Sequence, residues 1–207
     1  NISATHAAMS ATRVMGTCAI VGQAAGTAAA IAARHALTPR GVYEHRLHEL
    51  QQTLLADDCY LPWRVREITP RTRQARMSAS SGNSEALRDG VDRPVGGDEH
   101  AWTAPVGSNV ELAFDREISI SGLRLVFDSD LNRSRRFGMN ALYSRDMPTL
   151  APPPSLVKAF TVSVRAADGT WGEIARVNDN FQRLVRVALQ ARATAVRVTT
   201  TASWGNA

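Results

Sequence analysis

Two hydrophobic patterns divide the chain near Trp63. Before Trp63, strong helix formers and leucines recur at helical spacing, whereas from about Ala75 apolar and polar residues alternate in short runs. A period near 3.6 favours helices, and a period of two favours strands. The patterns therefore predict an α+β chain, with a helical pair at residues 1–62, a linker at 63–77, and an antiparallel β-sandwich or jelly roll at 78–207.

The helical part is expected to hold two helices. Residues 22–35 are mostly Ala, Gly and other small residues and end in Arg34 and His35, which suit a helix C-terminus. Thr38 followed by Pro39 predicts the start of a second helix that ends near Asp57. Its apolar stripe is expected at Tyr43, Leu47, Leu50 and Leu54.

The first predicted helix is apolar on all faces. Gly22, Gly26 and Ala30 recur every four residues, so that another backbone can approach closely. The uninterrupted apolar stretch, 18–33, is short for a membrane span, and we expect none. Because two helices cannot bury both of their apolar surfaces, we expect a protein body that precedes Asn1.

Turn signals separate the predicted strands of the second part. They are Asp89-Gly90, Gly96-Gly97, Ser121-Gly122 and Asp168-Gly169, of which Asp-Gly is the strongest cue for a hairpin. Residues 147–154 are rich in proline and predict a long loop. The strands are expected at 110–114, 118–120, 123–127, 160–164, 184–189 and 196–198.

Charge and cysteine content exclude several classes of protein. The formal net charge is +5, but the densest basic cluster, at 64–76, has no aromatic residues interleaved with it, so we expect no nucleic-acid partner. Cys18 and Cys59 fit neither a disulfide framework nor a zinc site, and both are expected to be small buried hydrophobes. The chain begins at Asn1 without a leader segment, so its location stays open between bacterial cytoplasm and export.

A close resemblance covers about the first sixty residues. Its residues are Thr12-Arg13-Val14-Met15, Thr17-Cys18-Ala19 and the run from Gly22-Gln23 to Ala29, followed by the leucine-rich second helix. They resemble the C-terminal end of the FAD-binding domain in a bacterial family of FAD-dependent oxidoreductases. The resemblance implies a two-dinucleotide-fold flavoprotein, with FAD as cofactor and hydride transfer to flavin as the reaction.

The resemblance also implies which residues contact the flavin. A helix N-terminus offers unpaired N–H groups and partial positive charge, which stabilise negative charge on the N1/O2 edge of reduced flavin. We expect residues 15–22 to supply those groups and Arg13 to add a full charge. The cofactor-binding candidates are Arg13, Met15, Gly16, Thr17, Cys18, Ala19, Gly22 and Gln23.

The phosphate half of a flavin site is missing from the sequence. No GxGxxG follows a predicted strand, and no acidic ribose partner can be placed. We therefore expect an enzyme only as the full-length protein, with this fragment inactive and FAD bound with an upstream domain. The substrate is a small molecule that the sequence does not identify. Catalytic residues are not assigned, although His6 is a candidate acid or base, and Cys18 a candidate redox partner.

The second part resembles, more loosely, galactose-binding-like β-sandwiches of the discoidin and coagulation-factor C type. The resemblance rests on Leu87-Arg88-Asp89-Gly90, Trp102 and the strand runs at 110–131, 160–180 and 195–207. It implies the architecture more strongly than the ligand, because members of that fold bind sugars, lipids or proteins and some are purely structural. Carbohydrate is a candidate partner. The alternative function is therefore a noncatalytic carbohydrate-binding protein, whose aromatic residues either stack on sugars or fill the core. These residues are Trp63, Trp102, Tyr143, Trp171 and Trp204.

Two weaker groups of residues do not make a metal site. Asp128, Asp130 and Asn132 alternate as in a calcium loop, but Arg133 replaces the required glycine, leaving either a sandwich-loop calcium site or an Asx turn. His45 and His48 share a helix face without a third ligand, so a solvated surface is expected. We predict no bound metal.

Overall fold

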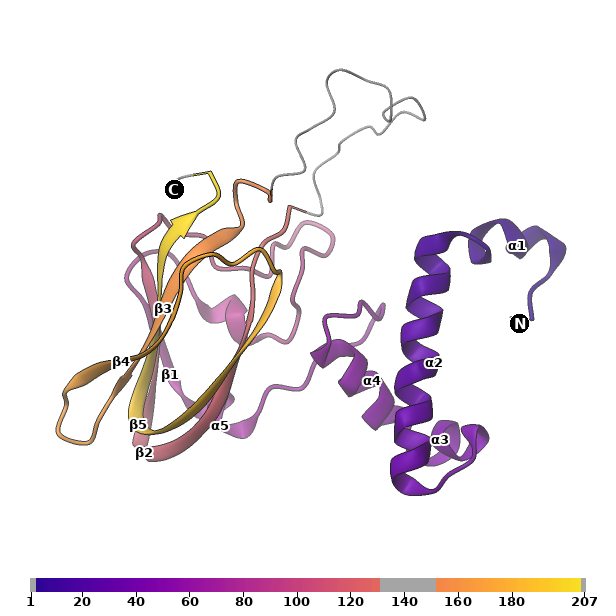
Figure 1. The fold of residues 1–207 in the computed structure, drawn as a ribbon, viewed down its shortest axis with the longest axis horizontal. Helices are drawn as coiled ribbons and strands as arrows, with labels where there is room; N and C mark the ends of the chain where they lie inside the picture. The colour runs from indigo at the N-terminus through magenta and orange to yellow at the C-terminus, as the bar shows by residue number, and fades with distance from the viewer. Residues whose placement is uncertain (1–2, 131–151, 206–207) are drawn as a thin grey trace, which may run out of the picture. The chain divides into compact units, whose positions relative to one another are not determined.

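The computed structural model describes residues 3–130 and 152–205. They form two compact units, Asn1–Glu67 and Ile68–Ala207, the first helical and the second built on a β-sheet (Figure 1). The α+β class predicted from the two hydrophobic patterns is confirmed. Residues 70–79, most of which the sequence assigned to a linker, form a short helix and a strand of the second unit.

The helical unit consists of four helices, two of which the sequence did not predict as separate elements. The segment before Arg13 is helical, and Thr5 caps its start by accepting a hydrogen bond from the N–H of Ala8 at 3.3 Å. The helices are α1 (His6–Thr12), α2 (Met15–His35), α3 (Pro39–His45) and α4 (Leu47–Ala56).

The second predicted helix is confirmed in position but is broken at Arg46. Thr38 caps it as expected, its hydroxyl accepting the N–H of Gly41 at 3.1 Å. The backbone of Arg46 leaves helical geometry (φ −134°, ψ 16°), which changes the direction of the buried stripe. The side chain of Val42 is therefore buried in α3, whereas that of Tyr43, predicted to lie on the apolar stripe, is exposed.

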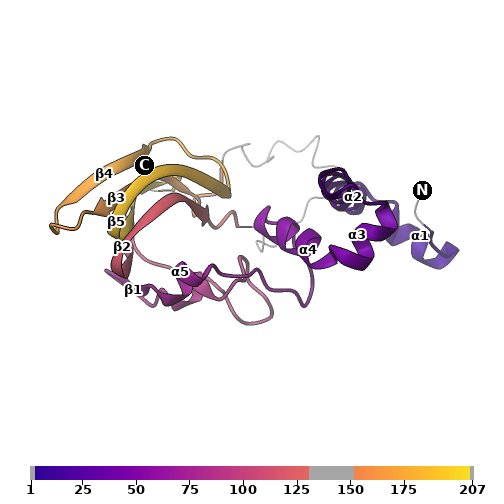
Figure 2. The ribbon, with the colours of Figure 1, turned by 90° about the horizontal axis from the view of Figure 1, so that it is seen from below.

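The second unit contains one antiparallel sheet in the order β1-β2-β5-β3-β4. Figure 2 shows these strands along an arc that runs from β4 to β1. Two shorter helices, α5 (Pro70–Gln74) and the 3₁₀ turn η1 (Glu85–Arg88), precede the long strands. The strands are β1 (Arg76–Ala79), β2 (Asn109–Val126), β3 (Val157–Arg165), β4 (Trp171–Val177) and β5 (Leu184–Ser203).

The expected short strands between Asn109 and Val126 join into one bent strand. Its register against β5 shifts twice, between Ala113 and Ile118 and again near Gly122. Ser121-Gly122, expected to be a turn, is therefore part of β2. A side chain at Gly122 would meet the carbonyl oxygen of Val187 at 3.0 Å, so glycine permits the close approach of the neighbouring strand.

The hairpin expected at Asp168-Gly169 is confirmed and joins β3 to β4. Gly169 has a φ of +88°, the left-handed region that favours glycine. The Asp168 carboxylate accepts the backbone N–H of Thr170 at 2.9 Å and its hydroxyl at 2.7 Å. These two hydrogen bonds lower the pKa of Asp168 because they stabilise its charged form.

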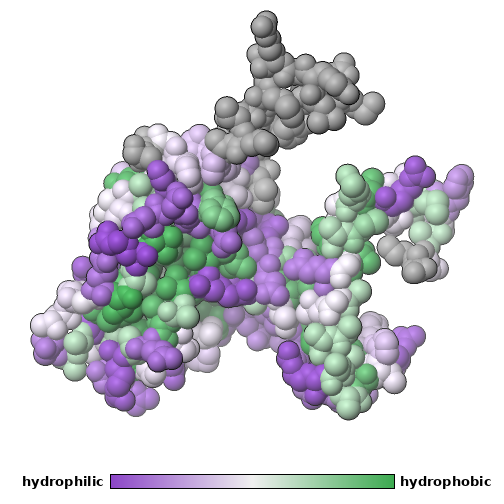
Figure 3. All heavy atoms as spheres, viewed as in Figure 1, coloured by the Kyte–Doolittle hydropathy of each residue, from purple (hydrophilic) through white to green (hydrophobic). Residues whose placement is uncertain are grey.

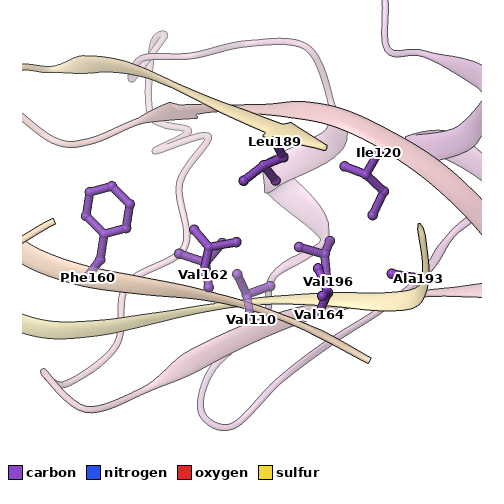
Figure 4. Packing of buried hydrophobic residues seen from close by; sticks show 9 residues of the cluster. Val110, Ile120, Phe160, Val162, Val164, Leu189, Ala193 and Val196 are labelled. Carbon is purple, nitrogen blue, oxygen red and sulfur yellow. The ribbon is translucent and has the colours of Figure 1, made fainter. Parts of the chain in front are cut away.

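The bent strands bring two halves of the sheet face to face around an apolar core. Figure 4 shows the side chains of Leu189 and Ile120 opposite those of Phe160, Val162 and Val110. The Phe160 side chain is 0% exposed, and its ring centroid lies 5.3 Å from that of Phe127. This arrangement confirms the sandwich-like fold that alternating hydrophobicity predicted.

Candidate functional site

The predicted cofactor-contacting residues lie at a sharp corner between α1 and α2. Arg13 ends α1, and Val14 has extended backbone geometry (φ −78°, ψ 147°) immediately before α2 begins at Met15. The first predicted helix, α2, therefore begins seven residues before Gly22, where the sequence pattern placed its start. As a result, Arg13 lies at the end of α1, two residues before the N-terminus of α2.

Two side chains of α2 hold this corner. The Thr17 hydroxyl donates to the carbonyl oxygen of Ala11 at 3.0 Å, and the Cys18 thiol donates to that of Thr12 at 3.6 Å. These bonds satisfy carbonyl groups at the end of α1 that have no partner inside that helix. The expectation that Cys18 is buried is wrong, because its side chain is exposed at this corner, whereas Cys59 is buried as expected.

The N-terminus of α2 presents free backbone donors. No side chain caps this end, and the first backbone hydrogen bond runs from the N–H of Cys18 to the carbonyl oxygen of Val14. Within the described residues, no acceptor takes the N–H groups of Met15, Gly16 or Thr17. A Cβ at Gly16 would meet nothing within 4 Å, so a planar ligand could lie directly against this backbone.

The remaining predicted contacts, Ala19, Gly22 and Gln23, lie farther along α2. Their N–H groups belong to the helical hydrogen-bond ladder, so they cannot act as free backbone donors. Their spacing nevertheless places them on one exposed face together with Gly26. Neither Gly22 nor Gly26 would meet anything within 4 Å if it carried a Cβ. They therefore form a smooth surface and not an electrostatic site.

The opposite face of α2 packs within its own unit. Ile31 is 1% exposed. The carboxylate of Glu49 on α4 lies 3.2 Å from the imidazole of His35 and 3.4 Å from the guanidinium of Arg34. The Arg34–Glu49 ion pair and the contact between His35 and Glu49 join the C-terminus of α2 to α4, and the positive charge of Arg34 suits the negative end of the helix dipole.

Most of α2 nevertheless remains exposed. Met15 is 89% exposed and Ile20 is 53% exposed. Figure 3 shows mostly apolar residues on the visible face of this helix. In the part of the chain that the structure describes, α2 is the one helix long and apolar enough to cross a membrane by length and composition. The core helix of a soluble protein and a signal sequence pass the same test, so our expectations of no membrane span and of a protein neighbour both stay predictions.

The histidine and carboxylate candidates show no metal-binding geometry. Both His45 and His48 are exposed, and their closest acidic partners are Glu44 at 3.9 Å and Glu67 at 3.0 Å. His6 is exposed on α1. Among residues 3–130 and 152–205, no three His, Cys, Asp or Glu side chains could hold a common metal ion.

The proposed calcium loop is described only in part. The N–H of Asp130 donates to the Asp128 carboxylate at 2.8 Å, which is the Asx turn that we gave as the alternative. Asn132 and Arg133 lie outside the described residues.

The expected aromatic candidates mostly have structural partners. The indole N–H groups of Trp102 and Trp204 donate to the carbonyl oxygens of Ser81 and Asn180, each at 2.7 Å. The guanidinium of Arg197 lies 3.8 Å from the ring centroid of Trp171. Trp63 is exposed on a turn, with a φ of +60°, and Tyr143 lies outside the described residues.

One exposed aromatic residue escaped the sequence analysis. Phe181 is 69% exposed, next to the buried Asn180. The Asn180 side chain donates to the carbonyl oxygens of Val157 and Gln182, at 2.8 and 3.0 Å, which holds the loop in place. No local sequence pattern distinguishes Phe181 from the core phenylalanines, because its exposure depends on this loop.

A family comparison agrees with the resemblance of the N-terminal residues. Residues 1–54 match the family model described as FAD dependent oxidoreductase. The match ends inside α4 and therefore covers α1, the corner, α2 and α3. No curated protein matches the chain.

Several solved β-sandwich structures are similar to the chain. A family 32 carbohydrate-binding module from Streptococcus pneumoniae EndoD is 13% identical, with a TM-score of 0.45, and the match covers 64% of this chain and 86% of that module. The family 32 module of C. perfringens NanJ, solved with galactose, is 10% identical, with a TM-score of 0.44 and coverages of 66% and 88%. A further module from Clostridium perfringens, solved with GalNAc-β-1,3-galactose, is 12% identical, with a TM-score of 0.42 and coverages of 66% and 90%.

Proposed function

We propose that this chain is the C-terminal part of an FAD-dependent oxidoreductase, in which the α1–α2 corner completes the flavin site and the β-sandwich is an accessory module. The observation that supports this proposal is that the family match at residues 1–54 coincides with a helix terminus whose backbone donors are free. The body that binds the rest of FAD would precede Asn1 in the complete protein.

The residues at the corner fit the electron-rich edge of a flavin. A bound flavin would supply the hydride-accepting chemistry, and its reduced form would carry more negative charge. The N–H groups of Met15, Gly16 and Thr17 would stabilise that charge together with the helix dipole. The exposed Arg13 would add a full positive charge. Gly16 would permit contact because no side chain stands between its backbone and the ring.

The exposed residues of α2 give the proposed body a surface to cover. Ile20 and Val21 are exposed in this chain, and Gly22 and Gly26 leave room for close backbone approach. Burying one such aliphatic side chain contributes about 1.5–3 kcal/mol. We infer that the cofactor-binding body packs on these exposed residues of α2.

Replacing Arg13 by alanine in the complete holoenzyme tests the role of the corner. We expect a lower flavin reduction potential, because the reduced flavin loses a stabilising positive charge, with flavin content retained. Arg40→Ala is the matched control, since Arg40 is also exposed and stacks on Tyr43 in α3, with its guanidinium 5.6 Å from the ring centroid. An unchanged flavin reduction potential in the Arg13 variant, measured by spectroelectrochemical titration, would show that Arg13 does not act on the flavin. A complete protein that purifies without flavin would contradict the proposed function itself.

A further inference from the structure

We draw no further inference here: the strongest candidate, the apolar patch at the open side of the folded sheet, between the outer edge of β4 and residues 184–189 of β5 (Figure 3), carries no proposal because nothing in the described residues shows what covers it.

Discussion

The helical unit and the sheet unit bury their apolar residues to very different extents. In the sheet unit, Phe160, Val162 and Ala193 are fully buried and lie between two halves of one folded sheet. In the helical unit, α2 consists mostly of apolar and small residues, but Ile31 is the one residue of this helix that is buried. The hydrophobic effect stabilises a fold only through apolar surface that is removed from water. The sheet unit therefore has the core of an independent domain, whereas the helical unit has an unused apolar face that suits a neighbouring protein body.

The largest loss of stability is expected from truncating a side chain in the core of the sheet unit. Phe160→Ala removes a fully buried ring and should cost about 3–5 kcal/mol. Urea unfolding of the 207-residue chain, followed by tryptophan fluorescence, would measure this loss. Phe181→Ala is the matched control because the Phe181 ring is mostly exposed, and we expect a change of less than about 0.5 kcal/mol. Equal effects of the two substitutions would show that the core is not where the structure places it.

A second pair of variants compares a buried and an exposed position along α2. Ile31→Ala removes a buried side chain and should destabilise the helical unit by about 2–5 kcal/mol. Ile20→Ala changes a side chain that is 53% exposed, three turns before Ile31 on the same side of the helix, and should have little effect in this chain. Circular dichroism at the helix band during urea unfolding reports on this unit, since α2 is its longest helix. A large loss of stability in the Ile20 variant would mean that this side chain is already covered in the chain itself.

A third comparison tests the bend in β2. Gly122→Ala should cost about 1–3 kcal/mol because the new methyl group would press against the carbonyl oxygen of Val187. Gly172→Ala in β4 is the control, since a Cβ there meets nothing within 4 Å. Thermal unfolding of both variants measures the difference. If Gly122→Ala were as stable as the control, the strands would not approach as closely as the structure shows.

The smallest effect is expected at the β3–β4 hairpin. The pKa of Asp168 is lowered in the folded chain, so its charged form stabilises the fold above the ordinary carboxyl pKa, and this contribution is lost as pH falls through the lowered pKa. Asp168→Asn should therefore slightly lower the melting temperature at pH 7, and this difference should shrink as pH falls through the lowered pKa of Asp168. Asp179→Asn, at another exposed carboxylate, serves as the control. A deficit that persists unchanged at pH 2 would attribute the effect to the turn and not to the charge.

The sequence predicted local features of the fold better than features that depend on tertiary contacts. The Thr38 cap and the Asp168-Gly169 hairpin were predictable because each depends on residues two or three positions apart. The helix break at Arg46 was not predictable, because no Gly or Pro near Arg46 signals it. Ser121-Gly122 has the composition of a turn, but its glycine serves the contact with Val187 across the sheet.

The candidate site was predictable only in part for the same reason. The resemblance indicated the residues from Arg13 to Gln23, but their spacing did not show where the helix begins. That boundary depends on the corner held by the Thr17 and Cys18 side chains, which bind carbonyl groups of α1 six residues earlier. The corner divides the predicted residues into free backbone donors at 15–17 and a smooth packing surface farther along α2.

The most direct test of the proposed function is to read the coding DNA upstream of Asn1 in frame. The account predicts a strand, a GxGxxG turn and a helix, with an acidic residue at the end of the next strand, because the chain supplies no binding element for the FAD pyrophosphate. A start codon or signal peptide shortly before Asn1, without that unit, would contradict the account and leave the exposed face of α2 without its proposed partner.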